Sequence, residues 1–346
     1  MTQDCFAKRG AVLAALLFFA LAGCEPATPP EVLFQGPTMG AEYHVKAVAR
    51  LSKEENAALH DAILAVLDRI NTLMSNYQPE TELSRFNRAL ANTPFPVSPE
   101  TATVFACALQ VSRESQGAFD ITVGPLVNAW GFGPEMTAEP PAEAALEELL
   151  QRVGYEKLHL EGNQLTKDRD DVSCDLSALA PGFAADEMAR LLESKGLNRY
   201  MIEVGGEVRA LGLNKNDTPW RIGIEKPLPE IREIGRVVAL DGNSLATSGD
   251  YRHFITVDGV RRSHTIDPST GRPIEHQIAS VTVIHKECMW ADAYATALNV
   301  MGPERAKAFA ETHQLAVFLI LHDGKNGFEE WASPRFEPFI HVPVAG

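Results

Sequence analysis

LATSGDYRHFITVDGVRRSHTIDPSTG, residues 245–271, gathers small hydroxyl residues, a glycine, a histidine and two Asp-containing turns. Asp258 and Gly259 lie between two runs of strand-forming residues, a pattern typical of a two-residue β-hairpin turn. A hairpin centred there places residues 247–249 and His264 at the same open end, where such groups can hold a phosphate or move a proton. A plain polar hairpin is the alternative, and the stretch taken alone favours it slightly. The rest of the chain must distinguish between these two interpretations.

The sequence on both sides of this stretch predicts an α+β (mixed α/β) fold in which mostly antiparallel sheets are flanked by helices. A capping-box pattern, Ser52 followed by Glu55, predicts a long helix, and Ser98-Pro99 predicts the start of a second. Apolar residues at helical spacing predict further helices in segments 142–153, 178–192 and 289–301. Alternating apolar residues predict strands at 43–46, 157–160, 164–167, 200–204, 220–225, 235–240, 278–285 and 315–321.

One segment fits neither period. Residues 117–134, GAFDITVGPLVNAWGFGP, contain four glycines and two prolines. Such a segment is typical of a packed junction or the lining of a ligand pocket.

The N-terminus has the pattern of an export signal. Lys8 and Arg9 precede an apolar run, residues 10–22, that is too short to span a membrane. Leu21-Ala22-Gly23-Cys24 resembles a bacterial lipobox, so we expect residues 1–23 to be a lipoprotein signal peptide and Cys24 to be lipidated. The alternative is an ordinary signal that is cut nearby. Residues 24–36 are then expected to be the lipidated cysteine and a tether, and residues 37–346 the main domain.

Residues 31–37, EVLFQGP, match the recognition sequence of a picornaviral 3C protease. They are either an engineered scar or a chance match, so residues 31–35 carry no functional argument here.

Charge and cysteine content exclude several classes of protein. The chain of 346 residues has a formal net charge of −15, which argues against binding to a nucleic-acid backbone or to anionic lipid. An anionic ligand therefore needs a local site or a metal ion. Cys107, Cys174 and Cys288 are scattered without a CxxC motif and are expected to be buried apolar residues.

Asp292 and Thr296 are the best metal candidates. They lie one turn apart on a predicted helix and can offer two hard oxygens to one ion. Mg²⁺ prefers oxygen ligands and takes only one or two from protein, the rest being water and phosphate. The alternative is a polar helix face on which Thr296 bonds back to its own turn. The chain contains no GxGxxG motif, P-loop, GxSxG or HExxH that would indicate another chemistry.

Three further residues allow a plain and a functional interpretation. Asp175, with Ser177, can cap the following helix or shape a turn that directs a backbone carbonyl towards the metal. Tyr77 can stack on a planar ring or be an ordinary surface residue. Asp120 can hold a ligand hydroxyl or ring edge, or form an Asx turn.

Taken together, the motifs resemble the bacterial FAD:protein FMN transferases, the ApbE-type flavin transferases, from Gly36 to about Ala308. Eight blocks in order carry the resemblance. They are GPTMG at 36–40; Tyr77 with ELSRFN at 82–87; GAFD at 117–120 with GPL at 124–126; DLS at 175–177; VGGE at 204–207; ATSGDY at 246–251; His264 with IDP at 266–268 and Thr270-Gly271; and ADA at 291–293 with ATAL at 295–298.

The resemblance implies an activity and a site. Such enzymes take FAD, release AMP and attach FMN through a phosphoester to a Ser or Thr hydroxyl of a flavoprotein subunit of a membrane redox complex. FAD would lie in a cleft between sub-domains, with Mg²⁺ at its diphosphate. The implied metal ligands are Asp292, Thr296 and the carbonyl of Ala178. The implied FAD contacts are Met39, Tyr77, Ala118, Phe119, Asp120, Asp175 and Ile266. His264 would help to activate the acceptor hydroxyl, and Asp292 would act with it in catalysis.

Two departures from the family pattern concern affinity. Ala41 stands where Thr is usual, and Pro181 stands where Lys or Glu is more common. Binding of FAD, and the balance between transfer and hydrolysis, can therefore differ here. The alternatives are a Mg²⁺-dependent FAD pyrophosphatase that gives FMN and AMP, and a non-catalytic flavin-binding or flavin-delivery lipoprotein. The expected location is the periplasmic side of a bacterial inner membrane, reached through the lipid anchor alone.

Overall fold

The computed structural model describes residues 29–134, 139–228, 231–249, 254–257, 260–325 and 327–340. The predicted signal peptide, the predicted lipidation site Cys24 and the turn residues Asp258 and Gly259 lie outside the described residues. Within the described residues, no helix is both long and apolar enough to cross a membrane.

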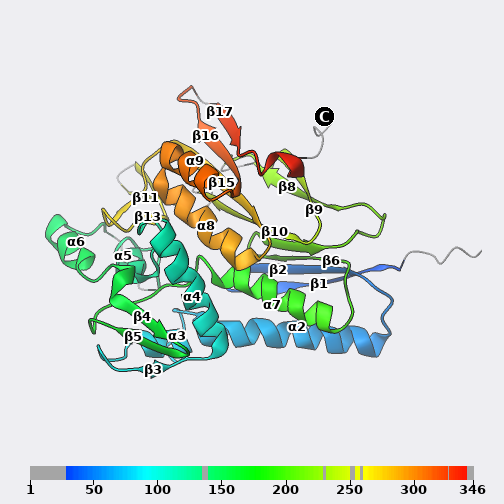
Figure 1. The fold of residues 1–346 in the computed structure, drawn as a ribbon, viewed down its shortest axis with the longest axis horizontal. Coiled ribbons are helices and arrows are strands. Elements are labelled where there is room, and N and C mark those ends of the chain that lie inside the picture. The colour runs from blue at the N-terminus through cyan, green and yellow to red at the C-terminus, as the bar shows by residue number, and fades with distance from the viewer. Residues whose placement is uncertain are drawn as a thin grey trace, which may run out of the picture.

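An eight-stranded sheet forms the centre of the molecule, in the order β1-β2-β6-β7-β10-β15-β16-β17 (Figure 1). Every neighbouring pair in it is antiparallel, as the sequence predicts. Its strands are β1 (Glu31–Thr38), β2 (Ala41–Val48), β6 (Tyr200–Val204), β7 (Glu207–Leu211), β10 (Asn243–Gly249), β15 (Ile278–His285), β16 (Ala316–His322) and β17 (Phe328–Ala332).

Four small sheets complete the strand content. The sheets are β3 (Phe95–Pro96) with β5 (Gln164–Lys167) and β4 (Leu158–Glu161); β8 (Trp220–Glu225) with β9 (Ile234–Leu240); β11 (Phe254–Val257) with β12 (Val260–Ser263); and β13 (Ile266–Asp267) with β14 (Arg272–Pro273).

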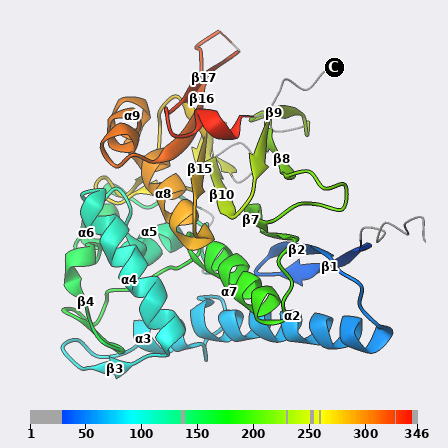
Figure 2. The ribbon, with the colours of Figure 1, turned by 45° about the vertical axis from the view of Figure 1, so that its right-hand side comes forward.

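Helices cover one face of the main sheet. The α-helices are α2 (Lys53–Met74), α3 (Glu82–Asn87), α4 (Pro99–Glu114), α5 (Gly124–Ala129), α6 (Glu143–Leu150), α7 (Ala180–Ser194), α8 (Cys288–Met301) and α9 (Pro303–Thr312), with short 3-10 turns at Ile121–Val123, Tyr155–Lys157 and Glu337–Phe339. Helices α7 and α8 pack side by side on the sheet, and α2 and α4 pack outside them (Figure 2). Helix α2 begins where the capping box predicts, because Ser52 and Glu55 satisfy each other's backbone N–H groups.

The β8–β9 hairpin covers the opposite face of the sheet. Its buried side chains, Trp220, Val238 and Leu240 among them, form a second apolar core with Phe318 and Phe336. The main sheet is therefore buried on both faces over part of its area.

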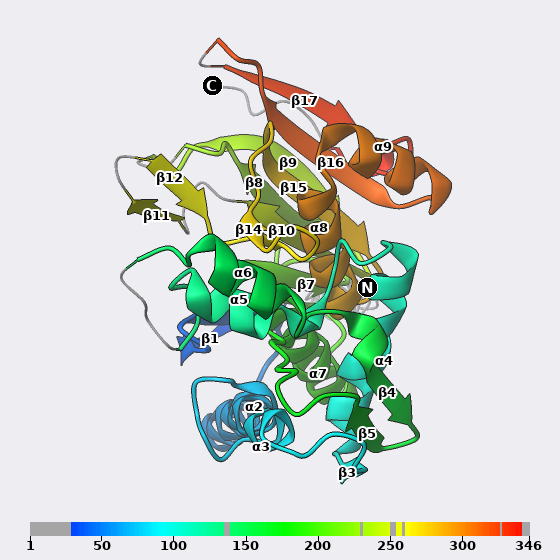
Figure 3. The same ribbon diagram turned by 90° about the vertical axis from the view of Figure 1, so that its left-hand side faces the viewer.

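Residues 245–271 do not form one hairpin. Residues 243–249 form β10 and pair with β7 and β15 inside the main sheet. A separate short hairpin, β11–β12, follows, with Val257 paired to Val260 as a two-residue turn requires. Hairpins β11–β12 and β13–β14 lie beside α5 and α6 at one end of the main sheet (Figure 3). The prediction of a long hairpin was wrong because the partners of β10 are distant in sequence.

Strand β1 contains residues 31–36, which we expected in the tether. Gln35 pairs with His44 and Gly36 pairs with Tyr43 along the edge of the sheet. Phe34 is buried and stacks on His60. The EVLFQGP sequence is therefore an integral part of the fold, and the folded region begins before residue 37.

Candidate active site

A cavity of about 480 Å³ opens at one end of the main sheet. The β1–β2 turn, the β6–β7 turn and the end of β10 form its floor, because all three lie at the same end of neighbouring strands. Helix α8 forms a second wall, and the segment that runs from Ala118 to Phe132 forms a third. This segment has no clean periodicity, and the prediction that it lines a pocket is confirmed.

Every predicted metal, FAD-binding and catalytic residue lines this cavity. They are Met39, Tyr77, Ala118, Phe119, Asp120, Asp175, Ala178, His264, Ile266, Asp292 and Thr296. Their sequence positions span more than 250 residues, so the fold brings together what the motifs only suggested.

Helix α8 is held in place by a cap from another helix. Asp186, buried in α7, accepts hydrogen bonds from the backbone N–H groups of Cys288 and Met289, each at 3.0 Å. Arg209 pairs with the same carboxylate at 2.9 Å. Because the first N–H groups of a helix lack partners within it, this contact fixes where α8 begins. It thereby fixes Asp292 about one turn, and Thr296 about two turns, further along the helix.

Asp292 is a buried carboxylate that accepts one hydrogen bond from the described residues. Gly182 N–H donates to its Oδ2 at 3.3 Å, and burial raises the pKa of Asp292 to about 7. Glu207, at the start of β7, is also buried in the cavity wall. Burial and the charge of Asp292 raise the pKa of Glu207 well above its ordinary value. Within the described chain, neither carboxylate has an ion pair with Lys or Arg.

The carbonyl of Ala178 is left without a backbone donor. Helix α7 begins at Ala180, and its N-cap is Leu179, not Asp175 or Ser177 as expected. Gly182 N–H, which would normally reach Ala178, bonds to Asp292, and Pro181 has no N–H. The Thr296 hydroxyl makes no hydrogen bond in the described structure, so the bond back to its own turn is not formed. Among the described residues, the Thr296 hydroxyl and the Ala178 carbonyl therefore lack hydrogen-bond partners, and the Asp292 carboxylate has one, Gly182 N–H.

The charge of the cavity indicates what it can hold. Four carboxylates line it, on Asp120, Asp175, Glu207 and Asp292, and no Lys or Arg of the described chain does. A cation would offset the repulsion between an anionic ligand and those carboxylates that are ionised. The described residues contain no group of three or more His, Cys, Asp or Glu with metal-binding geometry. Mg²⁺ suits the donor set that is present, because it takes few protein oxygens and completes its shell with water and phosphate.

Other residues that line the cavity are apolar or aromatic. Phe119 and Ile266 are buried there, whereas Tyr77 is 63% exposed at the mouth and its hydroxyl lies 3.4 Å from the carbonyl oxygen of Phe132. Met39 occupies the β1–β2 turn with a φ of 49°, a conformation that costs a non-glycine residue about 1 kcal/mol or more. Aromatic and thioether side chains suit a flat conjugated ring.

Asp120 and Asp175 are both engaged in local structure. Asp120 accepts hydrogen bonds from the backbone and hydroxyl of Thr122 and from Tyr155 N–H, so it forms the Asx-type turn that was its alternative interpretation. Asp175 accepts from Ser177 N–H at 2.8 Å and from the Asn76 amide at 2.9 Å. Both carboxylates still reach the cavity wall, and their contact with a ligand stays a prediction.

His264 lies on the side of the cavity formed by the segment between β12 and β13. Its ring meets the Phe132 ring edge-on, with centroids 6.4 Å apart and planes at 71°. Residues 247–249 reach the same cavity from β10. Residues 247–249 and His264 therefore line the same cavity, although β10 and β12 belong to different sheets.

Comparison with known proteins agrees with this geometry. The model of the ApbE family matches residues 39–319. The FAD:protein FMN transferase of Vibrio cholerae is 45% identical over 331 residues, covering 95% of this chain and 97% of the relative. The Escherichia coli protein of the same name is 39% identical over 344 residues, covering 96% and 97%. The chain belongs to the ApbE family.

Solved structures of this family have the same fold. The structure of the flavin transferase ApbE from Vibrio cholerae matches with a TM-score of 0.84 and 44% identity, over 90% of this chain and 99% of that one. The apo form of the flavinyl transferase ApbE from Pseudomonas stutzeri matches with a TM-score of 0.83 and 36% identity, over 92% and 99%. The resemblance inferred from the motifs is confirmed, and so is the α+β fold.

Glu207, Thr265 and Phe132 are among the cavity residues that the sequence did not identify as site residues. Glu207 follows Gly205-Gly206, and the positive φ of both glycines allows the tight turn that brings it into the cavity. Thr265 and Phe132 also line the cavity. The VGGE block contained the signal for Glu207, but nothing in its spacing indicated that its carboxylate would face Asp292.

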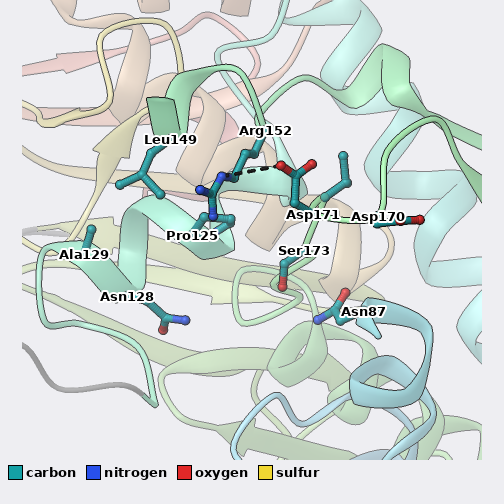
Figure 4. A pocket seen from close by; sticks show the side chains of 10 residues that line it. Asn87, Pro125, Asn128, Ala129, Leu149, Arg152, Asp170, Asp171 and Ser173 are labelled. Carbon is teal, nitrogen blue, oxygen red and sulfur yellow. Dashed lines mark ion pairs between the residues drawn. The ribbon is translucent and has the colours of Figure 1, made fainter. Parts of the chain in front are cut away.

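A second hollow, of about 420 Å³, lies on the other side of α5 (Figure 4). Pro125, Asn128 and Ala129 separate it from the first cavity, and none of the predicted site residues lines it. Its one cation, Arg152, lies 3.6 Å from Asp171 and also pairs with Glu148. The described structure thus leaves the first cavity as the candidate active site.

Proposed function

We propose that this chain is a Mg²⁺-dependent FAD:protein FMN transferase, which attaches FMN to a Ser or Thr hydroxyl of an acceptor flavoprotein and releases AMP. The observation that carries the proposal is the cavity itself. Its apolar and aromatic residues suit a flavin ring, and it is also lined by Thr296, Ala178 and Asp292, whose carboxylate accepts one hydrogen bond, from Gly182 N–H, among the described residues. The names of the family relatives supply the substrate, FAD, and the group that is transferred.

The protein residues have separate tasks in this proposal. Met39, Tyr77, Phe119 and Ile266 hold the flavin ring, and Ala118, Asp120 and Asp175 complete the FAD contacts. Asp292, Thr296 and the carbonyl of Ala178 would hold Mg²⁺, which would supply charge neutralisation at the diphosphate.

His264 acts at the acceptor hydroxyl. The hydroxyl oxygen forms a bond to the phosphorus of the FMN half, the bond from that phosphorus to the AMP oxygen breaks, and the hydroxyl proton passes to the imidazole. AMP leaves with the electron pair of the broken bond. The acceptor is expected to be a flavoprotein subunit of a membrane redox complex.

The N-terminal segment completes the proposal. A lipid on Cys24 would hold the domain at the periplasmic side of the inner membrane, within reach of membrane-bound acceptors. Labelling the cells with a radioactive fatty acid tests this part, because Cys24→Ser should abolish incorporation.

One experiment separates the proposal from its rivals. The protein is incubated with FAD, Mg²⁺ and a candidate acceptor domain, and the products are resolved on a denaturing gel and by chromatography. Fluorescent flavin on the acceptor together with AMP supports transfer. FMN and AMP without labelled acceptor support a pyrophosphatase, and intact FAD supports a non-catalytic carrier. Replacing the acceptor Ser or Thr by Ala provides the matched control.

A further inference from the structure

Asn299 lies behind the cavity wall and does not line the cavity. It is on α8, seven residues after Asp292 and three after Thr296, so all three share one face of the helix. Its side chain is 1% exposed. Its amide nitrogen lies 3.2 Å from Ser248 Oγ and 3.5 Å from Thr265 Oγ1.

Ser248, on β10, and Thr265, between β12 and β13, both line the cavity. The Asn299 amide therefore connects β10, the segment after β12 and the helix that carries the metal-site candidates. The contact to Ser248 has ordinary hydrogen-bond length, and the contact to Thr265 is weaker.

The direction of these hydrogen bonds decides what the two hydroxyls can do. Asn299 Oδ1 is buried without a hydrogen-bond partner. If the amide were turned over, Oδ1 would accept from the hydroxyls and the two N–H groups would be left unpaired. One unpaired acceptor costs less than two unpaired donors, so the orientation with the NH₂ group on the hydroxyls is preferred.

We propose that Asn299 is a positioning residue for anion recognition: its NH₂ group occupies lone pairs of the Ser248 and Thr265 hydroxyls, so that their hydrogens point into the cavity as donors to diphosphate oxygens. This inference rests on the proposed function. In a cavity lined by four carboxylates and no described Lys or Arg, hydroxyl groups are among the few side-chain donors that can contact phosphate. A hydroxyl engaged as an acceptor on one side is free to donate on the other.

A double-mutant cycle tests the inference by its effect on FAD affinity. The full chain is titrated with FAD in Mg²⁺ by flavin fluorescence, as the native protein, as Asn299→Leu, as Ser248→Ala/Thr265→Val, and with all three changes. Asn299→Leu is expected to weaken binding about fivefold in the native background. In the background without hydroxyls the same change is expected to alter binding by less than about twofold, because the groups that it orients are gone.

Each possible result either supports or overturns the inference about Asn299. An equal loss in both backgrounds, or no loss in the native one, would overturn the inference and leave the proposed function intact. Absence of FAD binding by the unchanged protein would overturn both. Thermal melting identifies folded variants, and Asn299→Ala provides the same cycle if the leucine variant does not fold.

Discussion

The backbone N–H of Gly182 donates to Asp292 Oδ2 at 3.3 Å, and this bond joins the first turn of α7 to the metal-site candidate on α8. The bond has two consequences. It orients the carboxylate towards the cavity, and it removes the donor that would otherwise satisfy the Ala178 carbonyl. One contact between two helices thus prepares two of the three proposed metal ligands.

Gly182→Ala is expected to disrupt this arrangement. A Cβ at this position would lie 2.7 Å from the carbonyl oxygen of Cys288 and 2.9 Å from Met289 Cα, so α7 and α8 would have to separate. We expect a loss of about 1–3 kcal/mol in the free energy of unfolding, as for other overpacked sites. Mg²⁺-dependent FAD affinity should fall with it. Chemical denaturation and FAD titration measure both effects, and Ser194→Ala, at the exposed end of the same helix, is the control. Native values for both quantities would contradict the account.

The pKa of Asp292 predicts a pH-dependent effect of Mg²⁺ on stability. Burial raises this pKa from 3.8 to about 7, so the metal-free folded protein keeps a proton that the unfolded chain has lost. Stability without metal therefore decreases as the pH rises between these two values. Mg²⁺ binds the ionised form, so its stabilising effect should grow across the same range.

Thermal melting in Mg²⁺ and in EDTA measures this effect. The difference in Tm should be larger at about pH 8 than at about pH 5. Asp292→Asn should remove the difference at both values. A difference that is independent of pH would argue that Asp292 does not bind the metal.

Asp186 is predicted to be a major structural carboxylate. Asp186→Ala removes the cap of α8 and leaves the half-buried Arg209 without its closest carboxylate. Breaking a buried pair on one side costs about 3–5 kcal/mol. Glu187→Ala, at the next position, removes only a surface pair with Arg190 and should cost about 1 kcal/mol or less. Comparable losses from the two variants in urea denaturation would disprove the assignment.

Strand β1 is predicted to protect the EVLFQGP sequence. Its Gln35 and Gly36 are paired with β2, and a protease needs an extended, unpaired chain. A picornaviral 3C protease should therefore cut the folded protein at least about a hundredfold more slowly than it cuts the same sequence in an unfolded chain. The same sequence in an unstructured linker is the control. Cutting at the rate of the linker would place residues 31–36 outside the fold.

The sequence predicted local features well and long-range pairing poorly. The capping box at Ser52, the pattern of α4 and the alternation in β2 all act over a few residues, and the structure confirms each. The partners of β10 are β7 and β15, and no local pattern in β10 indicates which strands it joins. The expected long hairpin failed for this reason.

The candidate site shows the same limit. Helical spacing identified Asp292 and Thr296 as candidates, and the family resemblance added Ala178 and the residues predicted to contact FAD. Glu207 and Asn299 were missed because their proposed roles depend on residues distant in sequence. These are Asp292 for Glu207, and Ser248 and Thr265 for Asn299. Asp175 was expected to be a possible cap of α7, but its carboxylate is used by Ser177 and Asn76.

The central claim is that this cavity binds FAD together with a divalent cation. Titrating FAD into the purified protein by flavin fluorescence, in Mg²⁺ and in EDTA, tests it most directly. We predict saturable FAD binding in Mg²⁺ and no binding in EDTA. For Asp292→Asn we predict no binding in either condition. Equal affinity in Mg²⁺ and EDTA, or no saturable binding in either, would contradict it.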